Sequence, residues 1–234
     1  MSGDDLLNAF LGGRLPAIPA LLTKRKAYFA FHYDDVMRVN NVRNAWKIDH
    51  PDSPLLRSFY DSSLWERKKL ESDEAVKILI RQGVQYTSAV CVLVGTDTWM
   101  RRWVKYEIAR AVIDGRGLLA VHINGLNHHQ RRTSDLLGLN PLHLLGVCRY
   151  ANEQYYLYEL KPGLSLSLTG QSEWQWKPYK DYTLPVKLPR YLSAPNVGFV
   201  MPLSRGTMEY DFAASEGDKN IGRWIDAAAM SVGR

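Results

Sequence analysis

Continuous apolar runs alternate with amphipathic segments over the first half of the chain. Residues 89–94 (AVCVLV) and 118–123 (LLAVHI) are apolar almost throughout, as in strands buried on both faces of a parallel sheet. The segment between them carries apolar side chains at helical spacing, namely Val104, Ile108, Ala111 and Val112. Gly115 and Gly117 supply a stop for that helix. The pattern predicts a strand, a loop, a helix and a second strand.

Two further units precede this one. Residues 26–33 (KAYFAFHY) predict a strand that runs into a loop, after which Asp34 or Asp35 can begin a helix. Within residues 49–71 we expect a short strand and a long loop, followed by a helix that starts near Ser72. Strands that alternate with helices are typical of a doubly wound, flavodoxin-like parallel sheet, so the fold class is predicted as α/β.

The pattern changes after residue 124, where prolines, tryptophans and short alternating segments take over. Residues 155–161 (YYLYELK) and 173–179 (EWQWKPY) predict hairpin strands that decorate the main sheet. A last helix is expected at about residues 218–232, with Ile221, Trp224, Ile225 and Ala228 as its packing face.

These patterns divide the chain into three parts. We expect an N-terminal arm at 1–24, an α/β core at 25–150, and a β-rich elaboration with a terminal helix at 151–234 that packs on the core. The arm is apolar, but Asp4 and Asp5 precede its apolar stretch where a signal peptide would carry positive charge. It is also too broken to span a membrane, so we expect no membrane association.

Composition limits the chemistry. The chain has 234 residues, of which 46% are hydrophobic, enough for a full core. Cys91 and Cys148 lack metal-ligand spacing and form no disulfide framework, which favours a reducing cytoplasm. His128 and His129 are adjacent and have no evident third ligand, so we expect no metal site and no bound cofactor.

The net charge of +6 is spread over short clusters at residues 24–26, 101–102 and 131–132. No long basic tract with interleaved aromatic residues occurs, so nucleic acid is not an expected partner. A solvated surface is the first interpretation of these charges, and attraction of a small anionic ligand such as a diphosphate is the second.

One carboxylate stands out on the helix that follows the strand at 89–94. On a helical wheel, Trp103, Glu107, Arg110 and Asp114 share a stripe beside the apolar one, which places Glu107 where core meets solvent. In open α/β sheets the ligand crevice lies outside the carboxyl ends of the strands, and an early turn of the following helix overlooks it. Glu107 is therefore a candidate reactive group, although a helical glutamate is more often a solvated charge.

The residues after the first strand are the other candidates. Phe31, His32 and Tyr33 lie at its expected carboxyl end, where they could stack on a nucleotide and form hydrogen bonds with it. Packing is an equally good interpretation of the same side chains.

Several blocks of the chain resemble a known family. They are KAYFAFHYDDV, VNNVRNAW, SLWE, TSAVCVLVG, RRWVKYEIARAV and the tail YDFAASEGDKNIGRWID. They are similar to the bacterial TIR-like proteins of the Thoeris antiphage system, of the ThsB type, over blocks from Arg25 to Ala227.

The resemblance implies a TIR fold and a function. It implies cleavage of NAD+ to nicotinamide and an ADP-ribose-type signal, expected to be cyclic, that activates a partner effector during infection. It implies that Glu107, the last residue of Trp103-Val104-Lys105-Tyr106-Glu107, is the catalytic glutamate, with Trp103 as a packing wall of the pocket. Trp65 in SLWE is expected at the pocket rim or at a self-association surface, and the oligomeric state stays open.

One carboxylate can suffice for this chemistry. Ordinary glycoside cleavage needs a proton donor and a second carboxylate. The nicotinamide of NAD+ is already cationic and leaves as a neutral molecule, so the barrier is dominated by developing oxocarbenium charge, which a glutamate can stabilise.

A non-enzymatic TIR scaffold is the alternative function. A phospho-accepting receiver domain on the same topology ranks lower, because the available Asp34 and Asp35 follow the first strand.

Overall fold

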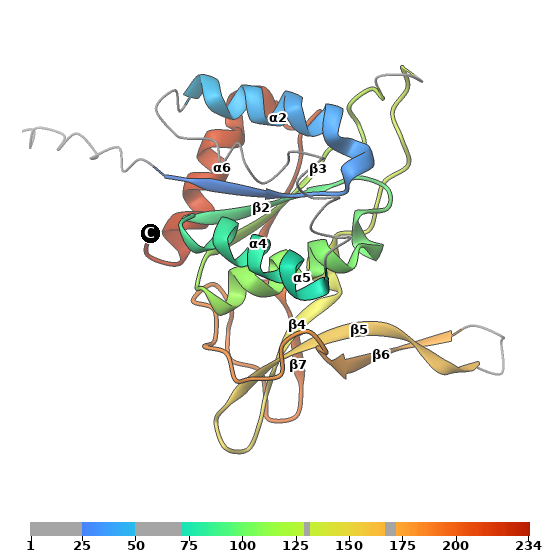
Figure 1. Ribbon diagram of the computed structural model, residues 1–234, viewed down its shortest axis with the longest axis vertical. Coiled ribbons are helices and arrows are strands. Elements are labelled where there is room, and N and C mark those ends of the chain that lie inside the picture. The colour runs from blue at the N-terminus through green and yellow to red at the C-terminus, as the bar shows by residue number, and fades with distance from the viewer. Residues whose placement is uncertain (1–24, 50–71, 129–131, 167–171) are drawn as a thin grey trace, which may run out of the picture.

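The computed structural model describes residues 25–49, 72–128, 132–166 and 172–234 (Figure 1). A parallel sheet lies between two layers of helices, and an antiparallel sheet lies beyond one of those layers. This arrangement confirms the predicted α/β class and the doubly wound parallel sheet.

Four of the described strands form the parallel sheet in the order β1-β2-β3-β8. They are β1 (Ala27–Ala30), β2 (Ala89–Val94), β3 (Gly117–His122) and β8 (Met208–Asp211). Every residue of β1, β2 and β3 is buried, as the continuous apolar runs predict for strands covered on both faces. The sheet therefore supplies two cores, one on each side.

Helices cover both faces of this sheet (Figure 1). One face carries α2 (Val36–Asp49) and α6 (Gly217–Ser231), and the other carries α4 (Asp73–Gln85) and α5 (Arg102–Ile113). Short 3-10 helices lie at Tyr33–Asp35, Thr98–Met100, Pro141–His143 and Leu203–Arg205. The four apolar residues predicted as the packing face of the last helix are all buried. No described helix is long and apolar enough to cross a membrane.

Local signals set the ends of the helices. The hydroxyl of Ser72 accepts a hydrogen bond from the backbone N–H of Ala75 and caps α4, as predicted. At the end of α5, Gly115 has φ of +60°. Its N–H and that of Arg116 donate to the carbonyl oxygens of Val112 and Ala111, which is the Schellman pattern. The turn directs the chain straight into β3.

A second sheet follows β3 in the sequence. Its strands, in the order β6-β5-β4-β7, are β4 (Leu145–Arg149), β5 (Tyr155–Leu166), β6 (Ser172–Pro178) and β7 (Val200–Pro202). The predicted hairpin at 155–161 and 173–179 is confirmed as the antiparallel pair β5 and β6. These strands were expected to decorate the main sheet. They form a sheet of their own, because β4 pairs with β5 and β7 rather than with any strand of the parallel sheet.

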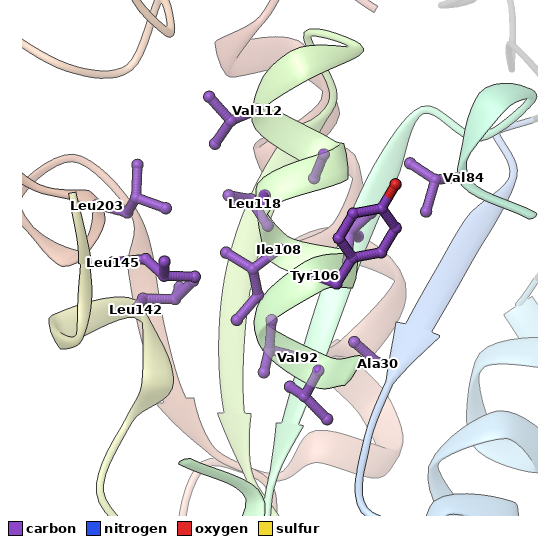
Figure 2. Packing of buried hydrophobic residues seen from close by; sticks show 14 of the residues in the cluster. Ala30, Val84, Val92, Tyr106, Ile108, Val112, Leu118, Leu142, Leu145 and Leu203 are labelled. Carbon is purple, nitrogen blue, oxygen red and sulfur yellow. The ribbon is translucent and has the colours of Figure 1, made fainter. Parts of the chain in front are cut away.

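The antiparallel sheet packs on the outer side of α5 (Figures 1 and 2). Ile108 and Val112 of α5 lie between Leu118 of the parallel sheet and Leu145 of the antiparallel one, in one continuous core. Seven residues of α5 are buried, including Glu107. Apolar burial of this kind contributes about 25 cal/mol per Å², so the two sheets and α5 stabilise one another.

Ion pairs fasten the polar positions of α5 to the chain around the antiparallel sheet. Lys105 Nζ lies 2.9 Å from Glu159 Oε1 on β5, and the two side chains are 13% and 8% exposed. Arg102 donates to both carboxylate oxygens of Asp181, at 3.1 and 2.7 Å. Lys77 of α4 also pairs with Asp181, at 3.2 Å.

The domain boundary at residue 150 differs from the structure. The segment 151–234 was expected to be an elaboration, yet it supplies the fourth strand of the parallel sheet, β8, and the helix α6 that covers it. The pairing of β8 with β3 joins residues almost ninety positions apart, for example Leu119 and Met208, and no local pattern records it. The arm at 1–24 lies outside the described residues.

The Asp181 cluster generates a prediction on acid stability. The hydrogen bond from Arg102 is the main cause that lowers the pKa of Asp181 from 3.8 to about 2. A carboxyl group with a lowered folded pKa stabilises the fold above its unfolded pKa and loses that contribution as the pH falls through the folded value. We expect Asp181→Asn to lower the free energy of unfolding by about 2 kcal/mol near neutral pH, with the deficit vanishing between about pH 4 and pH 2.

Urea unfolding across this pH range checks the expectation. The matched control is Asp218→Asn, an exposed carboxylate of α6, for which we expect a change of no more than about 0.5 kcal/mol. If Asp181→Asn lowered the free energy of unfolding equally at all pH values, the loss would come from changed packing and not from the missing charge.

Candidate functional site

The carboxyl ends of β1 and β2 form the switch point of the sheet. The two strands are neighbours, yet the helix after β1 lies on one face and the helix after β2 lies on the other. The loops that leave them diverge, and in open α/β sheets the ligand crevice lies at this position.

A cleft of about 480 Å³ opens at this edge. Its described lining is His32, Asp34, Asp35, Arg38, Thr96, Asp97, His128, Asp135 and Leu136. Four carboxylates face one guanidinium among these residues, so the cleft is acidic. The volume is that of an ordinary small-molecule site.

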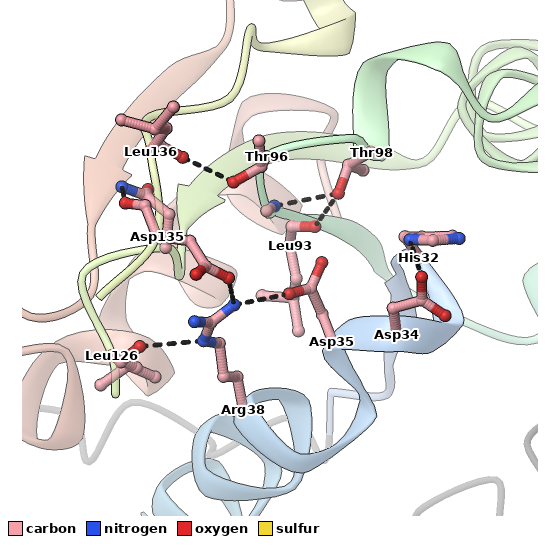
Figure 3. Close-up of polar contacts among 12 residues, drawn as sticks. His32, Asp34, Asp35, Arg38, Leu93, Thr96, Thr98, Leu126, Asp135 and Leu136 are labelled. Carbon is pink, nitrogen blue, oxygen red and sulfur yellow. Dashed lines mark hydrogen bonds and ion pairs between the residues drawn. The ribbon is translucent and has the colours of Figure 1, made fainter. Parts of the chain in front are cut away.

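Arg38 organises the cleft (Figure 3). Its side chain is 3% exposed and donates through Nη1 to Asp35 Oδ1 at 2.9 Å and to Asp135 Oδ2 at 2.7 Å. Its Nε donates to the carbonyl oxygen of Leu126 at 2.9 Å. A single buried cation thus joins the start of α2 to the loop that follows β3.

Burial governs the titration of the cleft. It raises the pKa of Asp35, against the effect of Arg38, which lowers it. It also lowers the pKa of His32, and the positive charge of Arg101 at the start of α5 acts in the same direction. Gly95 at the end of β2 permits the close approach of Asp35, because a Cβ there would lie 2.0 Å from Asp35 Oδ2.

Glu107 lies in the second turn of α5 and is 1% exposed. Its Oε1 accepts a hydrogen bond of 2.6 Å from the hydroxyl of Tyr28 on β1. The expectation of a residue at the border of core and solvent was wrong, because Glu107 is buried and its carboxylate contacts Tyr28 on the parallel sheet. A carboxylate buried in this way requires hydrogen-bond partners, and Tyr28 supplies one.

The three residues after the first strand lie in three different environments, namely the cleft, the core and the surface. His32 lines the cleft, as expected of a ligand contact. Phe31 is 4% exposed and belongs to the core under α2, with the Arg43 guanidinium 5.1 Å from its ring centroid, so it packs and does not face the cleft. Side chains alternate along a strand, and Phe31 follows Phe29 onto that face. Tyr33 is 46% exposed and does not line the cleft.

Of the two tryptophan candidates, the structure describes Trp103. Trp103 packs edge-on against Tyr106, with ring centroids 6.2 Å apart, and Arg102 stacks on its ring at 4.6 Å. Trp103 thus packs against its neighbours but does not line the cleft, so its expected role as a wall of the pocket stays a prediction. Trp65 lies outside the described residues.

Sequence reasoning missed the roles of four polar residues that shape the site. Asp35 was weighed as a helix cap and as a phosphoacceptor but not as the partner of Arg38, although the spacing of the two residues permits an ion pair across one helical turn. No sequence signal points to Asp135, which joins Arg38 from 97 positions away. Tyr28 was read as part of a strand, and its bond to Glu107 also spans a long sequence separation.

The described part of the chain gives no support for a metal site or a cysteine nucleophile. No group of three or more His, Cys, Asp or Glu side chains there could hold a metal ion. Cys91 and Cys148 are free thiols, and burial raises the pKa of both. Neither is suited to act as a nucleophile at neutral pH.

Comparison with known proteins agrees with the fold. The model of the family described as "Thoeris protein ThsB, TIR-like domain" matches residues 28–128. A relative from Bacillus cereus (strain MSX-D12), named "Putative cyclic ADP-D-ribose synthase ThsB1", is 34% identical over 206 residues, which cover 86% of this chain and 99% of the relative. Fold and match together define a TIR-like α/β protein. The chain belongs to the ThsB family of the Thoeris system, and the resemblance noted in the sequence is confirmed.

The Arg38 network predicts a pH-dependent defect. Arg38→Met leaves Asp35 and Asp135 without their buried cation, and we expect a loss of about 3 kcal/mol in the free energy of unfolding near neutral pH. Without Arg38 the pKa of Asp35 rises further, so Asp35 becomes protonated and the loss shrinks as the pH falls towards about 4.

Chemical denaturation at several pH values measures this effect. The control is Arg81→Met, which removes an exposed arginine paired with Glu74 on α4 and should cost less than about 1 kcal/mol. If the two arginine variants lost equal stability at every pH, Arg38 would not hold the cleft together.

Proposed function

We propose that this protein cleaves NAD+ to nicotinamide and a cyclic ADP-ribose-type signal that activates a partner effector. The printed name of the Bacillus cereus relative, a cyclic ADP-D-ribose synthase, supports this activity, and so does membership of the ThsB family. The observation that carries the proposal is the carboxylate of Glu107, held by the Tyr28 hydroxyl on the helix that begins at the switch point.

Glu107 would act by electrostatic stabilisation. When the bond from ribose to nicotinamide breaks, the pyridinium takes the bonding electrons and leaves neutral, while positive charge develops on the sugar. A carboxylate beneath that sugar stabilises the charge and orients the ribose hydroxyls. No proton donor is needed, which fits a site with one glutamate. An internal nucleophile then closes the ring if water is excluded.

Access is the second requirement of this mechanism. At 1% exposure, Glu107 does not meet a ribose in the conformation described here. We therefore propose that catalysis needs a rearrangement that uncovers the carboxylate, and that the conformation described here is inactive. Arg101 lies close enough to His32 to affect its pKa, so the start of α5 borders the cleft. Glu107 lies six residues after Arg101, and the helix rises by about 1.5 Å per residue.

A non-enzymatic TIR scaffold is the competing function, and the burial of Glu107 favours it. If the buried Glu107 only stabilises the fold, the protein would act through assembly with other TIR domains. Nicotinamide release by the purified protein separates the two functions, because a scaffold releases none.

Glu107→Gln is the direct test of the catalytic role. The amide keeps the shape but loses the charge, so we expect nicotinamide release to fall by about 10²-fold or more. The control is Glu159→Gln, a carboxylate that is 6% exposed and pairs with Lys105 on the outer side of the same helix. This control should lose stability but keep turnover per folded molecule. Wild-type rates in folded Glu107→Gln would reject the assignment.

Tyr28 is proposed as a positioning residue for Glu107. Tyr28→Phe removes one hydrogen bond to the carboxylate, and we expect kcat to fall about tenfold with little change in KM, because the bond supports the charge that stabilises the transition state. The control is Tyr179→Phe, a buried hydroxyl with no hydrogen-bond partner among the described residues. If Tyr28→Phe lowered the melting temperature and left kcat unchanged, its role would be structural only.

A further inference from the structure

A cavity of about 730 Å³ lies at the opposite edge of the parallel sheet from the cleft. It is bordered by the end of α5, the turn that leads into β3, the loop 182–191 and the residues after α6. Gly117 opens β3 at this amino edge, whereas the cleft lies beyond the carboxyl ends of β1 and β2. The cavity is therefore separate from the site proposed for NAD+.

Cations outnumber carboxylates among the charged residues that line this cavity. Arg116, Lys187, Arg190 and Arg234 all border it, and none of the four forms an ion pair within 4 Å with an acidic side chain of the described residues. Asp114 is the acidic residue of the described lining, and both of its oxygens bind Arg110. The charge of Asp114 acts on Arg116 as well, but one carboxylate shared with Arg110 offsets only part of the positive charge of the cavity.

Arg116 is the most informative of these cations. It is 8% exposed, its Nη2 donates to the carbonyl oxygen of Gln85, and its Nε has no partner among the described residues. Burial lowers its pKa, and the nearby charge of Arg234 lowers it further. A buried cation without a counter-charge lowers the stability of the fold. Proteins keep such a charge where a ligand supplies its partner.

Backbone hydrogen bonds hold Arg116 and Arg190 in place. The Schellman turn at Gly115 places Arg116 at the mouth of the cavity. Arg190 donates to the carbonyl oxygen of Val232 at 3.4 Å and lies against Gly233, where a Cβ would be 2.5 Å from its Nη1. Both guanidinium groups donate to backbone carbonyl oxygens, and their other donors are available for a ligand.

The remaining wall is apolar and aromatic. It is formed by side chains of α5 and of the loop 182–191, including Val112, Tyr182, Leu188 and Tyr191. The buried hydroxyl of Tyr191 has no hydrogen-bond partner among the described residues. Phosphate groups fit a cluster of guanidinium and ammonium groups, and a flat heterocyclic ring fits an apolar wall with a polar handle.

We propose that this cavity is a second ligand site that binds a nucleoside diphosphate, with the phosphates on Arg116, Lys187 and Arg190 and the base against the apolar wall. The site does not depend on the function proposed for Glu107. Its position at the end of α5 would allow a bound nucleotide to stabilise the same helix that carries Glu107.

Calorimetric titration of the full chain with ADP tests the proposal, with pyrophosphate as the probe that lacks a base. We expect the double variant Lys187→Glu, Arg190→Ala to raise the Kd for ADP at least tenfold, because both side chains are exposed and folding is left intact. Lys180→Glu, an exposed lysine that does not line the cavity, should leave the Kd unchanged. Glu107→Gln should also leave it unchanged, which separates this site from the catalytic one.

Arg116→Met supplies an independent measurement. Because the buried cation lacks an acidic partner among the described residues, its removal should leave the melting temperature of the free protein equal or higher, and it should abolish the rise in melting temperature that ADP produces. An unchanged Kd in the double variant, or no binding of ADP to the wild type, would overturn the proposal. Pyrophosphate binding as tight as that of ADP would overturn the assignment to a nucleotide.

Discussion

The burial of α5 between two sheets is the constraint on which the rest of the structure depends. A surface helix needs one apolar stripe, but α5 has apolar contacts with the parallel sheet on one side and with the antiparallel sheet on the other. Its polar residues must then find partners inside the protein. Lys105 pairs with Glu159 and Arg102 pairs with Asp181, so two charges of the helix have partners from the C-terminal half. The antiparallel sheet is thereby an integral part of the fold.

The same constraint creates a conflict at Glu107. A helix covered on both sides buries its glutamate, and a buried carboxylate is stable only with partners such as the Tyr28 hydroxyl. A ribose can reach that carboxylate only if part of the cover moves. Stability and access therefore act against each other at this residue, as they do at many functional sites.

The sequence predicted those parts of the fold that depend on local periodicity. The strands at 89–94 and 118–123, the helix between them and the cap at Ser72 follow from patterns of a few residues. The pairing of β8 with β3 and the contact of Arg38 with Asp135 did not follow, because each joins positions almost a hundred residues apart. The sequence also did not predict the burial of Glu107, which likewise depends on a segment distant in the sequence. A helical wheel gives the stripe on which a residue lies, but not whether a distant sheet will cover that stripe.

Charge is distributed unequally over the two edges of the parallel sheet, and this bears on how a dinucleotide would bind. The cleft at the carboxyl edge has Asp34, Asp35, Asp97 and Asp135 against Arg38, whereas the charged residues that line the cavity at the amino edge are four cations and one carboxylate. If NAD+ is the substrate, its cationic nicotinamide and neutral ribose hydroxyls match the acidic cleft, and its diphosphate does not. Like charges brought together at short range destabilise a complex, so the phosphates would have to point away from these carboxylates and towards solvent or the basic start of α5. Such an orientation would draw the scissile ribose inwards, towards Glu107, while the anionic end of the molecule stays outside.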